Sequence, residues 1–93
     1  DAFSRLVESF VDNGSSLLVQ LADAAGRDDL DALRRTAHTL KSNAASFGAT
    51  DLAERCAALE AQARDGAVDD ADHQVTTITA AFDAARCALR PDL

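Results

Sequence analysis

Apolar side chains recur along this chain at intervals of three and four residues, the spacing of one face of an α-helix. The clearest series begins after Asp28 or Asp29, where carboxylates favour a helix start. It ends before Gly48, a residue type common just past a helix end. The series therefore predicts an amphipathic helix that packs along a bundle seam. Its apolar positions are Leu30, Leu33, Ala37, Leu40, Ala44 and Phe47.

A second helix is predicted between Gly48 and Gly66. Asp51 and Glu54 resemble a capping box at its start, although Thr50 competes for the same capping position. Gly66 follows the last apolar position and is well placed beyond the helix end. The residues on the inner face are Leu52, Cys56, Leu59 and Ala63.

The last predicted helix begins within residues 69–72 and ends before Pro91, because proline disfavours helical geometry in the residue before it. No strand-like alternation of useful length is found in the chain. The apolar positions of this helix are Ala71, Val75, Ile78, Phe82, Ala85 and Leu89.

The N-terminal third of the chain has two apolar series separated by Asn13-Gly14, a pair typical of turns. Ser15 or Ser16 can cap the second series, and Gly26 ends it. The pattern leaves two alternatives open: two separate helices, or one long helix with a kink. The two series are Phe3, Leu6, Val7, Phe10 and Val11, and Leu17, Leu18, Leu21, Ala22 and Ala25.

Together these elements predict an all-α fold. We expect one domain over residues 1–93, because 93 residues suffice for a single core. The short connections favour antiparallel neighbours. The expected architecture is an antiparallel up-down four-helix bundle with an additional short or kinked N-terminal helix.

The charge balance narrows the range of partners. The chain carries a formal net charge of −7 and has a pI near 4.5. Nucleic-acid binding normally requires a broad basic surface, and so does adhesion to acidic lipids. No apolar run approaches the roughly 20 residues that span a bilayer. We therefore expect neither nucleic-acid binding nor direct membrane contact.

The two cysteines, Cys56 and Cys87, fall inside helical patterns and lack metal-type spacing. Sparse cysteines of this kind are usual in the reducing cytoplasm. We expect a cytoplasmic location, either as a free protein or as the cytoplasmic part of a larger membrane-bound protein.

The candidate chemistry centres on His38. This residue lies beside the apolar seam, about 100° around the helix from Ala37. The only lysine of the chain, Lys41, lies one turn further along, and Arg34 and Arg35 lie one turn before. Cations beside an imidazole favour its neutral, nucleophilic form. A nitrogen nucleophile surrounded by cations suits a histidine that carries a phosphoryl group, since phosphoryl transfer depends on positioning and charge neutralisation.

The same face of this helix also carries small residues. Ser42 and Ala45 follow His38 there and allow another protein surface to approach the imidazole closely. Lys41 can serve as the point charge for the phosphoryl oxygens. No Mg²⁺ cage is evident in the sequence, so we expect no cofactor on this chain and a Mg²⁺ ion on the partner. The predicted docking residues are Arg34, Arg35, Ser42, Ala45 and Gly48.

The segment Ala37–Ala49, followed by Asp51–Glu60, resembles the histidine-containing phosphotransfer (HPt) domain of bacterial multistep phosphorelays. Such domains are helical bundles that shuttle phosphoryl groups between aspartates of receiver domains. The resemblance implies that His38 is the phosphoacceptor and that Lys41 assists the phosphoryl group. Further matches are the Gly48-Ala49 turn, Cys56 and the pair Leu59-Glu60.

One position departs from the family pattern. Ser42 stands where these domains usually have glycine directly after the lysine. Serine is small enough to preserve close approach, and its hydroxyl could bond to the phosphoryl group or to the imidazole. The second histidine, His73, lies among Asp69, Asp70 and Asp72 with no cation nearby in the sequence, and we interpret it as a surface residue.

The sequence therefore predicts a phosphoryl carrier that exchanges phosphate with a receiver domain of a response regulator or hybrid kinase. No kinase motif or nucleotide-binding loop is present, so we expect no autonomous kinase activity. We expect a monomer. Two alternatives stay open: the phosphotransfer domain of a chemotaxis-type kinase, phosphorylated directly by an ATP-binding domain, and a helical adaptor that carries no phosphate.

Overall fold

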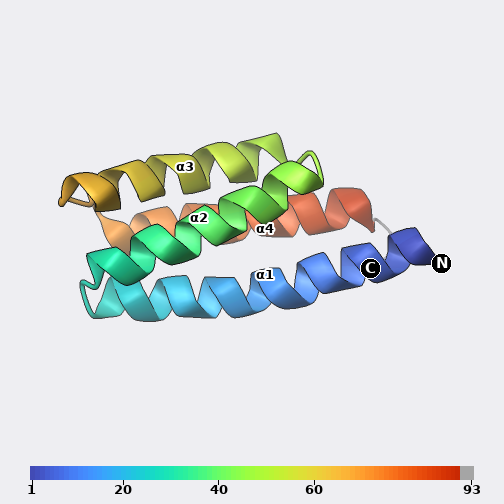
Figure 1. The fold of residues 1–93 in the computed structure, drawn as a ribbon, viewed down its shortest axis with the longest axis horizontal. Helices are drawn as coiled ribbons and strands as arrows, with labels where there is room; N and C mark the ends of the chain where they lie inside the picture. The colour runs from blue at the N-terminus through green and yellow to red at the C-terminus, as the bar shows by residue number, and fades with distance from the viewer. Residues whose placement is uncertain (91–93) are drawn as a thin grey trace.

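The computed structural model describes residues 1–90, which form four α-helices (Figure 1). Short turns join the helices, so that successive helices run antiparallel. Helix α1 packs against α2 and α4, and α3 packs against the same two helices, with the most extensive contact between α2 and α3. The expected all-helical bundle is thereby confirmed. The helices are α1 (Ala2–Gly26), α2 (Leu30–Ser46), α3 (Thr50–Asp65) and α4 (Ala71–Leu89).

The N-terminal third is one helix rather than two. Helix α1 continues through Asn13 and Gly14, so the long-helix alternative is the one observed. Gly14 is buried, and a Cβ atom at this position would clash with Cε1 of Phe82 in α4. The glycine therefore provides space for the Phe82 ring, and tertiary packing overrides its usual tendency to break a helix.

Most helix ends follow the sequence expectations. The side chain of Asp29 accepts a hydrogen bond from the Ala32 amide and caps α2. Gly48 and Gly66 both have positive φ angles, +70° and +90°, just past the ends of α2 and α3. Helix α4 ends at Leu89, before Pro91 as predicted, and Pro91 itself lies outside the described residues.

The expected cap of α3 is wrong. Its N-cap is Ala49, which makes no side-chain capping bond, so neither Thr50 nor a box of Asp51 and Glu54 caps this helix. The turn after α2 is so tight that the Ala49 amide still donates to the Ala44 carbonyl, at 2.9 Å. Backbone bonding in the turn thus fixes where α3 begins.

The core lies between the four helices and is lined mainly by aliphatic side chains. Phe10 of α1 joins it at one end, with its ring centroid 4.8 Å from Phe47 and 5.4 Å from Phe82. Cys56 is fully buried at the inner face of α3, and this burial raises the pKa of its thiol to about 12. The thiol is therefore a protonated packing group, as the sequence suggested. The largest fully buried side chains are Leu21, Leu33, Leu40, Leu52, Leu59 and Ile78.

None of the helices within residues 1–90 is both long and apolar enough to cross a membrane.

Helix α2 shows the arrangement that matters for function. Leu33, Ala37, Leu40 and Ala44 face the core, so the intervening His38 is directed to the rim between α2 and α3.

The close contact between Gly14 and Phe82 leads to a prediction about the stability of the fold. The variant Gly14→Ala should lower the free energy of unfolding by about 1–3 kcal/mol, because the added methyl group overpacks the core. The matched control is Gly26→Ala, where a Cβ would meet no atom within 4 Å. Urea denaturation followed by circular dichroism measures both. Equal stability of the two variants would show that the close approach is not tightly constrained.

Candidate functional site

The candidate site joins the facing sides of α2 and α3. Nδ1 of His38 lies 2.8 Å from Oε2 of Glu60, and Nζ of Lys41 lies 2.6 Å from Oε1 of the same carboxylate. The Glu60 side chain is only 6% exposed, whereas that of His38 is 56% exposed. A buried carboxylate on α3 thus holds an exposed imidazole on α2.

Electrostatics fix the ionisation of this carboxylate. The hydrogen bond from Lys41 lowers the pKa of Glu60, with a smaller contribution from His38, and together they outweigh the opposite effect of burial. An ionised carboxylate only accepts hydrogen bonds, so Nδ1 of His38 must donate its N–H to Glu60. In the neutral ring this leaves a free electron pair on Nε2, the other ring nitrogen.

Glu60 has a third partner, Arg64. Nη2 of Arg64, one turn further along α3, donates to Oε2 of Glu60 at 3.1 Å. The carboxylate therefore accepts hydrogen bonds from His38, Lys41 and Arg64, which satisfies a charge that would otherwise be costly to bury. The described residues leave no buried polar side-chain atom without a partner.

Neither Glu60 nor Arg64 was predicted as a site residue. Glu60 entered only as part of a family pattern, and Arg64 was not considered. The sequence did indicate partial burial of Glu60, because this residue follows the core residue Leu59 and lies at the border of the apolar face of α3. The contact with His38 spans 22 residues, however, and depends on how α2 and α3 are aligned. Helical periodicity does not determine that alignment.

The two arginines of α2 pair with a carboxylate of their own helix. Arg34 and Arg35 both bind Asp31, at 2.9 and 3.0 Å. Asp31 lies three and four residues before them, so these local pairs form readily. The hydrogen-bonded partner of the ring is the carboxylate of Glu60, and Lys41 and Arg64 reach the same carboxylate.

The small residues predicted for docking lie on an open surface. Ser42, Ala45 and Gly48 are exposed, and the Ser42 hydroxyl donates to the backbone carbonyl of His38 at 3.2 Å rather than to its ring. Beside them, a groove of about 380 Å³ runs between α2 and α3. Lys41 lines this groove and also binds Glu60, so one residue links the groove to the carboxylate that holds the imidazole. The other lining residues are Ala45, Gly48, Thr50, Ala53, Glu54 and Ala57.

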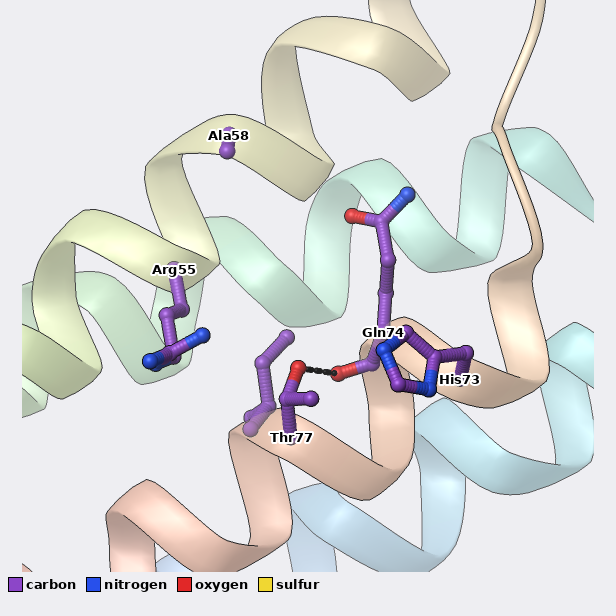
Figure 2. A pocket seen from close by; sticks show the side chains of 6 residues that line it. Arg55, Ala58, His73, Gln74 and Thr77 are labelled. Atoms are coloured by element: carbon purple, nitrogen blue, oxygen red, sulfur yellow. Dashed lines mark hydrogen bonds between the residues drawn. The ribbon is translucent and has the colours of Figure 1, made fainter.

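The second histidine lies elsewhere. His73 lines a pocket of about 230 Å³ between α3 and α4, where Figure 2 shows it near Gln74 and apart from Arg55. Arg55 is a cation on this pocket that the sequence did not reveal, but it binds Asp51 at 3.1 Å. His73 is exposed and lies on a different face from Glu60 and its three partners, His38, Lys41 and Arg64, which together we call the Glu60 cluster. Among residues 1–90, no group of three or more His, Cys, Asp or Glu side chains is arranged to hold a metal ion.

The lowered pKa of Glu60 makes a pH-dependent stability prediction. Because the folded-state pKa lies below the ordinary value of 4.5, the charge of Glu60 stabilises the fold above that pH. This stabilisation is lost as the pH falls through the folded-state pKa. The variant Glu60→Gln should therefore be less stable by about 1–3 kcal/mol near pH 7, and the difference should shrink below pH 4.5.

Denaturant titrations between pH 3 and pH 7 measure this difference. The matched control is Glu54→Gln, which alters an exposed glutamate of the same helix and should leave the stability near that of the wild type. A difference for Glu60→Gln that does not vary with pH would contradict the ionised cluster.

Comparison with known proteins agrees with this geometry. The family model for the Hpt domain matches residues 5–88. Phosphorelay protein LuxU of Vibrio harveyi is 31% identical over 85 residues, which are 91% of this chain and 75% of that protein. Phosphorelay protein LuxU of Vibrio vulnificus (strain YJ016) is 38% identical over 74 residues, 78% of this chain and 64% of that protein. No solved structure matches the chain. The chain belongs to the Hpt domain family and functions in phosphorelay signal transduction by histidine phosphotransfer.

Proposed function

We propose that His38 is the phosphoacceptor of this Hpt domain and exchanges its phosphoryl group with the aspartate of a receiver domain. The observation that carries the proposal is the bond between His38 Nδ1 and the buried carboxylate of Glu60, at 2.8 Å. This bond orients the ring and assigns its proton, while more than half of the side chain stays accessible to a partner. Both features are requirements for a nucleophile that another protein must reach.

The transfer step follows from this arrangement. The electron pair on Nε2 of His38 attacks the phosphorus of the aspartyl phosphate, a P–N bond forms, and the P–O bond to the aspartate breaks. The aspartate leaves as a carboxylate with the electron pair of that bond. The ring keeps its proton on Nδ1 and gains positive charge, which the adjacent carboxylate of Glu60 stabilises. The reverse sequence returns the phosphoryl group to a receiver.

Lys41 supports the step in two ways. Its short bond to Glu60 keeps the carboxylate ionised and in place, and its ammonium group adds positive charge beside the ring. We propose that the receiver brings the Mg²⁺ that phosphoryl transfer requires. Glu60 is engaged by three donors already, which supports a metal held by the partner rather than by this carboxylate. The free thiols of Cys56 and Cys87 support a cytoplasmic setting.

The docking surface is proposed to be the exposed face of α2 around Ser42 together with the adjoining groove. Small side chains there, Ala45 and Gly48 on one side and Ala53 on the other, leave room for apolar side chains of a receiver. Arg34 and Arg35 lie one turn before His38 and remain partly exposed, so they fit the polar rim of such an interface. The domain is proposed to act as a monomer that docks one receiver at a time.

Phosphotransfer from a labelled receiver domain tests the proposal. Wild-type protein should acquire an acid-labile, alkali-stable label that is absent in His38→Gln and unchanged in the control His73→Gln. Lys41→Ala should slow transfer by about ten- to a hundredfold while the helical content stays intact. Label that persists in His38→Gln would contradict the assignment of the phosphoacceptor.

The same assay separates the alternatives. Labelling that requires an ATP-binding kinase domain, with no transfer from any phosphorylated receiver, would indicate a chemotaxis-type phosphotransfer domain. Receiver binding without label from any donor, unchanged in His38→Gln, would indicate an adaptor. The phosphorelay relatives favour the receiver as phosphoryl donor, and the ordered His38–Glu60 pair favours a phosphoacceptor over an adaptor.

The docking surface makes a separate prediction. Ser42→Trp should weaken binding of the receiver domain by about tenfold or more, because a bulky ring on the exposed face of α2 blocks close approach. The matched control is Ser15→Trp, at an exposed serine of α1, a helix outside the proposed surface. Isothermal titration calorimetry measures both affinities. Undiminished binding by Ser42→Trp would show that the receiver docks elsewhere.

A further inference from the structure

The charges of the Glu60 cluster do not cancel. Lys41 and Glu60 together are neutral, so a site with only this pair would offer no net charge to a phosphoryl group. Arg64 adds one positive charge to the cluster. This surplus stands out in a chain of net charge −7, in which the general field opposes an incoming phosphate.

Of the donors to Glu60, Arg64 is also the one whose hydrogen bond can be broken at the lowest cost in free energy. Its bond to Oε2 is 3.1 Å long, against 2.6 Å for Lys41 to Oε1, and its side chain is 60% exposed, against 32% for Lys41. Oε2 accepts from His38 as well. If Arg64 moves away, both oxygens of the carboxylate therefore keep a hydrogen-bond partner, and Glu60 stays satisfied.

The chemistry of the side chain fits the phosphoryl group. Arginine has five N–H donors in a planar fork that matches two phosphate oxygens, and only one of Arg64's donors is used within the described residues. Because Arg64 and His38 bind the same oxygen, the guanidinium group lies close to the imidazole ring. The long, exposed side chain can reach around the ring edge toward a group on Nε2.

We infer that Arg64 is a second phosphoryl-binding residue of this site, which exchanges its bond to Glu60 for bonds to the phosphoryl oxygens on His38. The inference rests on the proposed function of His38. The phosphoryl group carries a charge of about −2 and the ring gains one positive charge, so His38, Lys41, Glu60 and Arg64 together go from +1 to neutral. Without Arg64 the same step runs from neutral to −1, which disfavours phosphohistidine relative to the aspartyl phosphate of the receiver.

The test measures the equilibrium between phosphorylated receiver and phosphorylated His38. Arg64→Gln, which keeps a hydrogen-bond donor but removes the charge, should shift this equilibrium toward the receiver by about tenfold or more. Arg64→Lys should restore it to within about threefold of the wild type. The matched control is Arg55→Gln, which removes a similarly exposed i,i+4 partner from α3 on the face toward α4 and should have no effect.

Two further readouts make the result specific. Affinity for the unphosphorylated receiver should be the same for Arg64→Gln and the wild type, and the guanidinium NMR signal of Arg64 should shift on phosphorylation while that of Arg55 does not. An unchanged equilibrium in Arg64→Gln would overturn the inference, as would an equal loss of receiver affinity. If wild-type His38 accepts no phosphoryl group at all, the proposed function itself fails, so the two failures are distinguishable.

Discussion

The buried carboxylate of Glu60 holds the functional site together. Glu60 lies on α3 between core residues and the rim, and its charge is tolerated there because three donors satisfy it. Two of these donors come from α2, so the carboxylate also connects the two helices that share the most extensive contact. Its position fixes the orientation of the His38 ring, the proton on Nδ1 and the charge next to the proposed phosphoacceptor. The site therefore depends on the alignment of α2 with α3 more than on any property of His38 alone.

Much of the fold could be predicted because its determinants are local. The apolar series of α2, α3 and α4 set which faces are buried, and Gly48 and Gly66 mark helix ends through their positive φ angles. Whether the N-terminal third forms one helix or two could not be decided from the sequence, for a physical reason. Asn13-Gly14 has the local character of a turn, whereas its helical state depends on the ring of Phe82, a residue 68 positions away from Gly14. The cap of α3 was wrongly predicted because the backbone of the turn, rather than a capping side chain, fixes where this helix begins.

Site residues on a single helix could likewise be predicted from the sequence, whereas those that depend on the packing of two helices could not. His38 and Lys41 could be found because they lie one turn apart on a single helix, and their spacing determines that they are neighbours. Glu60 and Arg64 could not be found in this way, since they reach the imidazole only after two helices have packed. Arg34 and Arg35 could be placed one turn before His38 by spacing alone, but spacing did not determine that both bind Asp31 of the same helix.

Glu60 holds the proton of His38 on Nδ1, and this leaves Nε2 as the atom that we propose accepts the phosphoryl group. Long-range ¹H–¹⁵N correlation spectra of the histidine ring test this directly, recorded before and after phosphorylation. We expect a protonated Nδ1 in the neutral ring and a phosphorus-coupled Nε2 in the phosphorylated protein. A neutral ring protonated on Nε2, or a phosphoryl group attached to Nδ1, would contradict this assignment.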